Sequence, residues 1–346
     1  MAGNKLTVYD IAREAGVSAA TVSRVLTGNV PVSEKTRQLV MDIVNKYDFK
    51  PSSVARSLKD RRSKTIGFIV PDITNPYFSQ LYLDLETRAS EIGYTVILCN
   101  SHSDLARESQ LLDVLQAKEA EVIVFAGGRV DSLLLTKRYV HEMERVSKAV
   151  PLITCSQMPG VPCIQLANDE EQGIRTLVQH LAAQGHRSVG MIGGRLDVRQ
   201  VFVRRQVLMD AAEQYGMRLE KRWLAEGGFS VASGRDTMDS LLARGALPTA
   251  IMAFNDVVAI GALGSLLRHG LSVPRDMALT GYDGISLTDN ITPSITTAAT
   301  NFKGYVDRIL EVVQQTVEGS IPPGLTTFPM HLIARDSTAA QAPAQE

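Results

Sequence analysis

Two short helices joined by a tight turn are predicted near the start of the chain, over residues 6–25. Thr7 is placed to cap the first helix, with Asp10 three residues later as its reciprocal partner. Gly16 lies in the turn, where the backbone needs a positive φ angle, and Ser18 is placed to cap the second helix. This spacing is typical of a helix-turn-helix, whose second helix enters the DNA major groove. An ordinary helical hairpin is the alternative that the pattern alone leaves open.

A third amphipathic helix is predicted after Ser33, which is placed at its N-cap. Apolar residues recur at helical spacing in all three helices, so we expect them to form one small core. They are Val8, Ile11 and Ala12 in the first helix, Val22, Val25 and Leu26 in the second, and Leu39, Val40, Ile43, Val44 and Tyr47 in the third.

The first 62 residues are basic, although the whole chain is nearly neutral. They hold eleven Lys/Arg and six Asp/Glu, a net charge of +5, whereas the rest of the chain has a net charge of −6. A basic segment favours contact with DNA phosphates, because each neutralised phosphate releases counterions. A solvated charged surface is the simpler alternative, but these basic residues coincide with the predicted helix-turn-helix.

Short motifs follow one another in a distinctive order through this region. They are Thr7-Val-Tyr-Asp-Ile-Ala12, Gly16-Val-Ser18, Thr21-Val-Ser-Arg-Val-Leu26, Val32-Ser33, Thr36-Arg37 and the segment Pro51…Val54-Ala55-Arg56…Leu58. In this order they resemble the LacI/GalR family of bacterial transcription regulators, and the resemblance extends over about residues 4–338.

After residue 63, short apolar runs alternate with amphipathic segments, which predicts a parallel α/β architecture. Strands are expected at 65–70, 95–98, 121–125, 152–155, 188–192, 250–253 and 277–281. Helices are expected near 76–92, 104–117, 169–184, 203–216, 231–243, 256–269 and 302–318.

The expected fold is an all-α helix-turn-helix head followed by an α/β body with two lobes of doubly wound parallel sheet. The body is similar to the periplasmic sugar-binding proteins, which implies that the chain crosses between the lobes three times. The expected division is a helix-turn-helix domain at 1–50, a hinge at 51–62, an effector-binding and dimerisation domain at 63–338 and a disordered tail at 339–346. The resemblance places lobe one at about 63–166 plus 300–328, and lobe two at about 167–299 plus 329–338, including a last strand near 329–336.

The resemblance implies DNA contacts from the second helix and the hinge. Ala19 and Ala20, at the exposed start of that helix, would present methyl groups to thymine, and Arg24 would bind guanine or phosphate. Residues 52–60 would form a hinge helix that orders on DNA, where Leu58 of each subunit would wedge into the minor groove. The predicted DNA-binding residues are Thr7, Ser18, Ala19, Ala20, Thr21, Ser23, Arg24, Val54, Ala55 and Leu58.

Polar and aromatic residues near the ends of the predicted strands suit the recognition of a polyol. Such a ligand needs planar donors and amides that hold neighbouring hydroxyls, and an aromatic face for the apolar side of its ring. The resemblance strengthens three of the polar candidates, because they match positions where family members hold an effector. The predicted effector-binding residues are Tyr77, Phe78, Arg204, Phe229, Asn255 and Asp283.

Each of these residues also has an ordinary interpretation. Asn255 is placed to cap the helix that begins at Asp256, Arg204 fits a solvated helix position, and an aromatic residue after a strand is often core. Several positions depart from the family pattern. Among them, Ser52 stands where an asparagine is usual, Ser156 where a charged residue is common, and Gly284 where a second aspartate is common.

The resemblance implies a transcription regulator, most simply a repressor whose affinity for DNA is controlled by a small polar effector. Its expected partners are a palindromic double-stranded operator, the effector and a second copy of the chain in a homodimer, since a palindrome mirrors two-fold symmetry. A sugar or sugar derivative, such as a sugar phosphate, is the first choice of effector, with a nucleobase or nucleoside as the alternative. A solute-binding protein with the same body is a much weaker alternative. No signal peptide or membrane span is predicted, so a cytoplasmic location is expected.

Catalysis is not expected, and no catalytic, cofactor-binding or metal-binding residue is predicted. The chain contains no G-x-S-x-G, G-x-x-x-x-G-K-[ST] or G-x-G-x-x-G motif. Cys99, Cys155 and Cys163 lack metal-like spacing and are expected to be free thiols in a reducing compartment. His180 and His186 are six residues apart, which is poor spacing for a shared metal ion.

Overall fold

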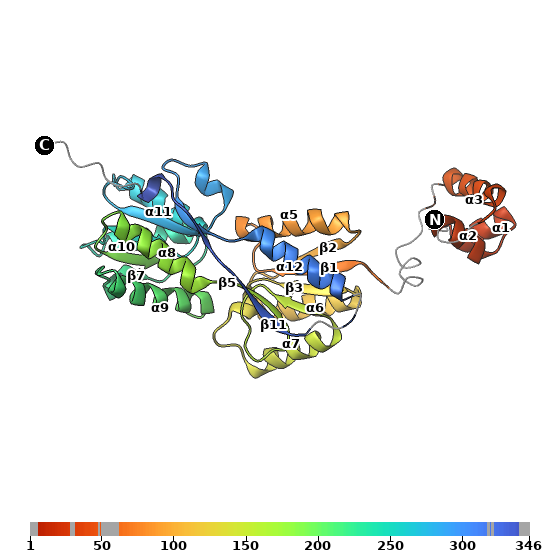
Figure 1. Cartoon of the computed structure of the whole chain (residues 1–346), viewed down its shortest axis with the longest axis horizontal. Helices are drawn as coiled ribbons and strands as arrows, with labels where there is room; N and C mark the ends of the chain where they lie inside the picture. Colours follow the sequence, from red (N-terminus) through yellow and green to blue (C-terminus); the bar gives the residue numbers. More distant parts are fainter. Residues whose placement is uncertain are drawn as a thin grey trace. The chain divides into compact units, whose positions relative to one another are not determined.

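The computed structural model describes residues 6–27, 32–47, 49, 62–316, 319 and 322–338, in two compact units divided after Ser63 (Figure 1). Most of the predicted hinge, residues 51–61, and the predicted tail, residues 339–346, lie outside the described residues. Three helices form the N-terminal unit: α1 (Val8–Ala15), α2 (Ala19–Thr27) and α3 (Glu34–Lys46).

Each of these helices begins at the predicted cap. The Thr7 hydroxyl accepts a hydrogen bond from the Asp10 backbone N–H, and the Asp10 carboxylate accepts one from the Thr7 N–H at 3.0 Å, which completes a capping box. The hydroxyls of Ser18 and Ser33 accept hydrogen bonds from the N–H three residues later, at 3.1 and 3.3 Å. Gly16 ends α1 with a φ of 66°. The predicted caps and turn are therefore confirmed.

The three helices share a small apolar core. The prediction that Leu39 and Tyr47 belong to it is wrong, because these side chains are 46% and 44% exposed. Leu39 lies one residue, or about 100°, away from the inward face of α3. The Tyr47 hydroxyl donates a hydrogen bond to the Glu14 carboxylate at 3.3 Å, which holds the polar end of the tyrosine at the surface. The buried residues are Ile11, Ala12, Ala15, Val22, Val25, Val40, Ile43 and Val44.

Two six-stranded sheets form the second unit. The first is entirely parallel, in the order β11-β5-β4-β3-β1-β2, and the second has the order β12-β10-β9-β8-β6-β7 with only β12 antiparallel. The strands of the first sheet are β1 (Thr65–Val70), β2 (Thr95–Asn100), β3 (Val122–Phe125), β4 (Leu152–Thr154), β5 (Ile164–Asn168) and β11 (Gly324–Phe328). Those of the second are β6 (Val189–Ile192), β7 (Leu224–Ala225), β8 (Ala250–Ala253), β9 (Ala278–Asp283), β10 (Thr296–Ala299) and β12 (His331–Ile333).

Helices cover both faces of each sheet, so the central strands are buried on two sides. On the first sheet, α5 (Pro76–Glu91) and α12 (Phe302–Gln315) pack on one face, and α6 (Leu105–Ala117) and α7 (Lys137–Ala149) on the other. On the second sheet, α8 (Glu170–Ala183) and α9 (Arg199–Gln214) pack on one face, and α10 (Val231–Leu242) and α11 (Asp256–Arg268) on the other.

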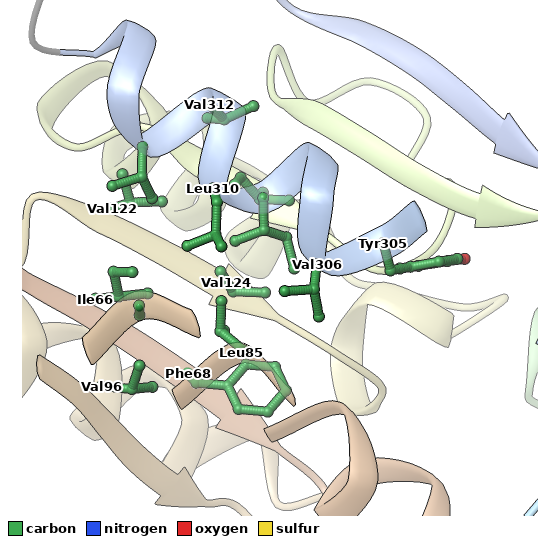
Figure 2. Close-up of a cluster of buried hydrophobic side chains, with 14 of the residues drawn as sticks. Ile66, Phe68, Leu85, Val96, Val122, Val124, Tyr305, Val306, Leu310 and Val312 are labelled. Carbon is green, nitrogen blue, oxygen red and sulfur yellow. The ribbon is translucent and has the colours of Figure 1, made fainter. Parts of the chain in front are cut away.

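The core of the first sheet joins segments that are far apart in the sequence. Phe68 and Val124 of the central strands lie with Leu85 of α5 and with Val306 and Leu310 of α12 in one buried cluster (Figure 2). The packing of α12 against this sheet ties the late part of the chain to its first strands.

The chain passes between the two sheets three times, as the resemblance implies. It leaves the first sheet after β5, returns after β10 through α12 to β11, and leaves again to form β12. The carboxyl ends of parallel strands in both sheets carry the loops that meet between them, which is where open α/β sheets bind ligands.

Several elements were not predicted from the sequence. Helix α7 is highly charged and buries only Met143 and Val146, and β5, β10 and β11 are short strands without a long apolar run. The predicted helix near 203–216 starts at Arg199, one turn earlier, and the strand predicted near 329–336 is limited to His331–Ile333. Within the part of the chain that the structure describes, no helix has both the length and the apolar character needed to cross a membrane.

Candidate functional site

A cavity of about 1120 Å³ lies among the loops at the carboxyl ends of the strands, lined from both sheets. The loops after β1, β3 and β4 line it from the first sheet, and those after β6 and β8, together with the end of β9, line it from the second. The structure brings all six predicted effector-binding residues to this one cavity. They are Tyr77, Phe78, Arg204, Phe229, Asn255 and Asp283.

Arg204 is buried in α9 and is held by a fork of hydrogen bonds. Its Nε and Nη2 atoms donate to the two carboxylate oxygens of Glu170 at 2.6 and 3.2 Å, and Nη1 donates to the Phe254 carbonyl at 2.6 Å. The rings of Phe254 and Tyr282 lie 4.4 and 3.6 Å from the guanidinium carbon. Burial opposes its charge, but Glu170, Tyr282 and Asp283 together outweigh this and raise the pKa of Arg204. Arg204 is therefore not a solvated helix residue but a fixed cation in the cavity wall.

Asn255 caps the helix that follows it, as its position in the sequence predicts, and it also lines the cavity. Its Oδ1 accepts the Val258 N–H at 2.8 Å and so caps α11. Its Nδ2 donates to the Phe229 carbonyl at 3.5 Å, which links the loop after β8 to the loop before α10. The side chain is thus held in one orientation at the cavity wall.

Asp283 ends β9 in a backbone conformation that L-residues rarely adopt, with a φ of 113°. Asp256 holds the turn that follows. Its carboxylate accepts the N–H groups of Gly284 and Ile285 at 2.7 and 2.8 Å and the hydroxyl of Thr297 at 2.7 Å. Because these hydrogen bonds join the turn to α11 and β10, the strained conformation of Asp283 persists.

The structure explains why a glycine stands at position 284, where an aspartate is common in the family pattern. Gly284 has a φ of 79°, and a Cβ atom there would lie 2.4 Å from the Cβ of Ala299 on the neighbouring strand. A side chain at this position would displace β10 or the turn. Glycine therefore lets Asp283 enter the cavity directly at the end of its strand.

Asp283 lines the cavity, and its carboxylate receives no hydrogen bond from any of the residues described. Its residue is 8% exposed, and burial raises the pKa of Asp283 well above its usual range, although the charge of Arg204 opposes this. The neighbouring carboxyl groups of Asp256 and Glu170 raise that pKa further. A bound molecule that donates hydrogen bonds would therefore supply what the protein leaves unmet.

Aromatic rings line the cavity from both sheets. Tyr77 and Phe78 at the start of α5 pack edge to face, with ring centroids 5.1 Å apart, and Tyr77 also contacts Phe302. On the second sheet, Phe229 and Phe254 pack with centroids 5.2 Å apart. Tyr77, Phe78 and Phe229 are half-buried, so each retains accessible ring surface. These rings form apolar walls around the polar groups.

A polar bridge between the two sheets was not predicted. Gln200 of α9 donates from Nε2 to the Asp131 carboxylate at 2.6 Å and to the Ser156 hydroxyl at 2.7 Å, and both of these acceptors belong to the first sheet's loops. Burial raises the pKa of Asp131 to about 6, although the hydrogen bond from Gln200 lowers it. Beside the bridge, the Leu133 N–H donates to the Asp197 carbonyl at 2.8 Å.

Glu170 is another residue of this site that sequence reasoning missed. It follows the α8 cap Asp169, directly after β5, a strand that was not predicted. Recognition of β5 would have placed Glu170 at the carboxyl end of a strand beside the other candidates.

The predicted DNA-contacting residues of the N-terminal unit lie at the start of α1 and along α2. The prediction that Ala19 is exposed is wrong: it is half-buried and packs against the three-helix core, whereas Ala20 and Arg24 are exposed. Thr7 and Ser18 are also exposed, Thr21 and Ser23 are half-buried, and Val54, Ala55 and Leu58 lie outside the described residues.

Two family models match the chain. The model described as "Bacterial regulatory proteins, lacI family" matches residues 7–52, which include all three helices of the N-terminal unit. The model described as "Periplasmic binding protein-like domain" matches residues 178–338 of the second unit.

Similar proteins include several transcriptional regulators. The transcriptional regulator DegA of Bacillus subtilis is 33% identical over 86% of this chain and 88% of its own length. Catabolite control protein A of Priestia megaterium is 30% identical, covering 84% and 86%, and the transcriptional repressor PurR of Actinobacillus pleuropneumoniae is 32% identical, covering 84% and 85%. A lac repressor dimer, solved with operator and the anti-inducer ONPF, has a TM-score of 0.83 at 26% identity, covering 97% of this chain and 99% of that one.

Proposed function

The chain belongs to the LacI family of bacterial regulatory proteins, and we propose that it is a repressor whose affinity for operator DNA is set by an effector in the cavity. It is a DNA-binding transcriptional regulator rather than an enzyme, as its relatives are. The observation that carries the proposal is the combination, in one chain, of a helix-turn-helix unit and a cavity lined by loops of two separate sheets. A ligand that contacts both sheets favours one arrangement of them over another, and a ligand shifts an equilibrium only by such a difference in affinity.

We propose a sugar or sugar derivative as the effector. The cavity supplies fixed planar polar groups in Arg204 and Asn255 and an acceptor in Asp283, with aromatic rings at its walls, and this suits hydroxyls on an apolar ring. A nucleobase or nucleoside is the second candidate, because the half-buried rings of Phe78 and Phe229 would also stack on a flat base. The names of the relatives include both a catabolite control protein and PurR, so both candidates belong in one screen.

The DNA side of the proposal is tested by selecting binding sites from a random pool of double-stranded DNA. We propose that the chain binds a palindromic site as a homodimer, so the selection is expected to enrich a two-fold symmetric sequence. Enrichment of an asymmetric site, or of none, would contradict this part of the proposal.

Arg24→Ala is expected to weaken binding to the selected site by about 1–3 kcal/mol, because we propose that this exposed side chain on α2 contacts a base. Fluorescence anisotropy titration measures the change, and Arg138→Ala, on α7 of the second unit, is the matched control that should leave it unchanged. Equal affinity of the wild type and Arg24→Ala for the site would remove Arg24 from base recognition.

Asp283→Ala is expected to weaken effector binding at least tenfold while operator binding without effector is retained. The loss follows because ligand hydroxyls would lose a buried acceptor, and an unpaired buried group costs about 1–3 kcal/mol. The effector is first identified by thermal-shift screening of sugars, sugar phosphates, nucleobases and nucleosides, since a ligand stabilises the native state that binds it. Calorimetry and operator titration are then compared between the variant and wild type.

Asp197→Ala is the matched control, since Asp197 also lines the cavity but its side chain is 56% exposed and paired with Arg195. A full effector response in Asp283→Ala would remove Asp283 from the site. Chemical conversion of the effector by the wild-type protein would overturn the assignment as a regulator.

A further inference from the structure

One arginine of the cavity lining has no partner among the described residues. Arg199 begins α9 and lies on the same face of that helix as Val203, four residues later, which also lines the cavity. The side chain of Arg199 is half-buried, and its Nε atom is fully buried without a hydrogen bond. No ion pair joins its guanidinium group to any residue that the structure describes. Because an unpaired buried donor is costly, a bound acceptor at this position would be stabilised.

A second arginine of the lining, four residues earlier in the chain, is only partly engaged. Arg195 donates from Nε to the Asp197 carboxylate at 3.0 Å, whereas its Nη1 and Nη2 atoms donate to no described residue. Its guanidinium carbon lies 5.6 Å from the ring centroid of Phe229, which also lines the cavity. The two Nη atoms of an arginine can bind both oxygens of a phosphate or carboxylate group.

The first turn of α9 adds positive potential beside these arginines. Val198 provides no side-chain cap to this helix, and its first turn contains no acidic residue. The first N–H groups of a helix have no partner within the helix and carry partial positive charge. Gln200 holds this turn against the first sheet through its hydrogen bonds to Asp131 and Ser156. The turn is therefore fixed in place before a ligand binds.

The carboxyl groups of the lining do not compensate Arg199. Three of the seven in the described lining form ion pairs with Arg175, Arg195 or Arg204, and two accept N–H groups of their own loops. Burial raises the pKa of the remaining two, Asp131 and Asp283, which favours their neutral forms. The seven are Asp72, Asp131, Asp169, Glu170, Glu171, Asp197 and Asp283.

We propose that the effector carries an anionic group, a phosphate or a carboxylate, and that Arg199 and Arg195 bind this group beside the first turn of α9. The inference rests on the proposed function, since it concerns the ligand of the same cavity. It narrows the effector from sugars, nucleosides and their derivatives to the charged derivatives, whose hydroxyls remain available to Asp283.

The test compares neutral compounds with their own anionic derivatives on the full-length protein. The sets are glucose with glucose 6-phosphate and glucuronate, ribose with ribose 5-phosphate, and adenosine with adenosine monophosphate. Thermal shift identifies the sets that bind, and calorimetry measures every member of such a set at one ionic strength. At least one anionic member is expected to bind at least tenfold more tightly than its neutral parent. The tighter of glucose 6-phosphate and glucuronate distinguishes a phosphate from a carboxylate.

Two variants then locate the preference within the cavity. Arg199→Gln removes the charge but keeps a planar donor, so the ratio between the affinities of the anionic and the neutral compound is expected to fall at least tenfold. Arg138→Gln removes the same charge from an exposed position outside the cavity lining and is expected to change that ratio less than twofold. The wild-type comparison does not depend on how the variants fold, and melting temperatures show whether each variant is native.

The outcomes separate this inference from the effector proposal. A neutral compound that binds as tightly as its anionic derivatives, or more tightly, overturns the inference and leaves the effector proposal intact. An unchanged ratio in Arg199→Gln also overturns it, because the anionic group would then bind elsewhere. If no compound of the effector screen binds, the effector proposal fails and this inference fails with it.

Discussion

Replacing Glu108 with alanine is expected to lower the free energy of unfolding of the second unit by about 3–5 kcal/mol. Glu108 and Arg129 are fully buried beside the first sheet, and Arg129 Nε donates to the Glu108 carboxylate at 2.8 Å. Arg129 also donates to Glu142 at 2.5 Å and to the Leu105 carbonyl at 2.6 Å. Removal of Glu108 leaves the buried cation with only part of its compensation, and an uncompensated buried charge is costly.

The effect is measured by urea unfolding, with Glu311→Ala as the matched control. Glu311 pairs with Arg308 at 2.7 Å on the surface of α12, where its side chain is 52% exposed, so its removal is expected to cost less than about 1 kcal/mol. Equal stability of the two variants would show that the buried network contributes no more than a surface ion pair.

The same network supports the functional cavity. A Cβ atom on Gly128 would lie 2.0 Å from the Glu108 carboxylate, so the chain that leads from β3 to Asp131 packs directly on this ion pair. Asp131 in turn accepts the hydrogen bond from Gln200 that bridges the sheets. Loss of Glu108 is therefore also expected to loosen the cavity wall on the side of the first sheet.

Ionisation of Asp256 is expected to lower the stability of the wild-type protein as the pH rises from about 4 to 8, and Asp256→Asn is expected to remove this contribution. Burial raises the pKa of Asp256 to about 7, against the hydrogen bonds from Thr297, Ile285 and Gly284. In the unfolded chain this carboxyl ionises near its ordinary pKa of 3.8, while the native state keeps its proton up to about pH 7. Raising the pH through this range therefore favours the unfolded state, by about 4 kcal/mol for this one group.

Asparagine suits the position because it reproduces the hydrogen bonds of a protonated aspartate. Its amide oxygen would accept the N–H groups of Gly284 and Ile285, and its NH₂ group would donate to the Thr297 hydroxyl, which can donate to the Ala298 carbonyl instead. Urea unfolding at pH 4 and pH 8 is expected to show equal stability of the two proteins at pH 4 and a more stable variant at pH 8. Asp283, whose pKa is also raised, titrates in both proteins, and because the charge of Asp256 contributes to that rise, its removal adds to the advantage of the variant at pH 8. A wild type that matches or exceeds the variant at pH 8 would contradict the prediction.

Helix caps and tight turns could be predicted from the sequence, because all the residues that form them lie within one short segment. The capping box of Thr7 and Asp10, the turn at Gly16 and the cap at Ser33 depend on residues within four positions of one another, and the structure confirms each of them. The strands at 65–70 and 250–253 are found with the predicted bounds, because apolar runs buried on both faces of a sheet are distinctive.

The six cavity residues could also be predicted from the sequence, because the ends of parallel strands lie along one edge of a sheet. The family resemblance indicated the same positions. It did not reveal their partners. Glu170 pairs with Arg204 across 34 positions of sequence, and Gln200 reaches Asp131 across 69 positions. Such pairs exist only after helices and strands from separate parts of the chain have packed together.

Tertiary structure alone decided which polar groups are satisfied and which remain open. The sequence alone suggests that the Arg204 guanidinium can bind a ligand, but in the fold it donates hydrogen bonds to Glu170 and to a backbone carbonyl. The carboxylate of Asp283, in contrast, receives no hydrogen bond from the described part of the chain. The exposures of Leu39 and Ala19 were likewise set by packing between helices and not by the periodicity of one helix. Hydrogen bonding and desolvation depend on distances between residues remote in sequence, and a pattern along one chain carries no record of those distances.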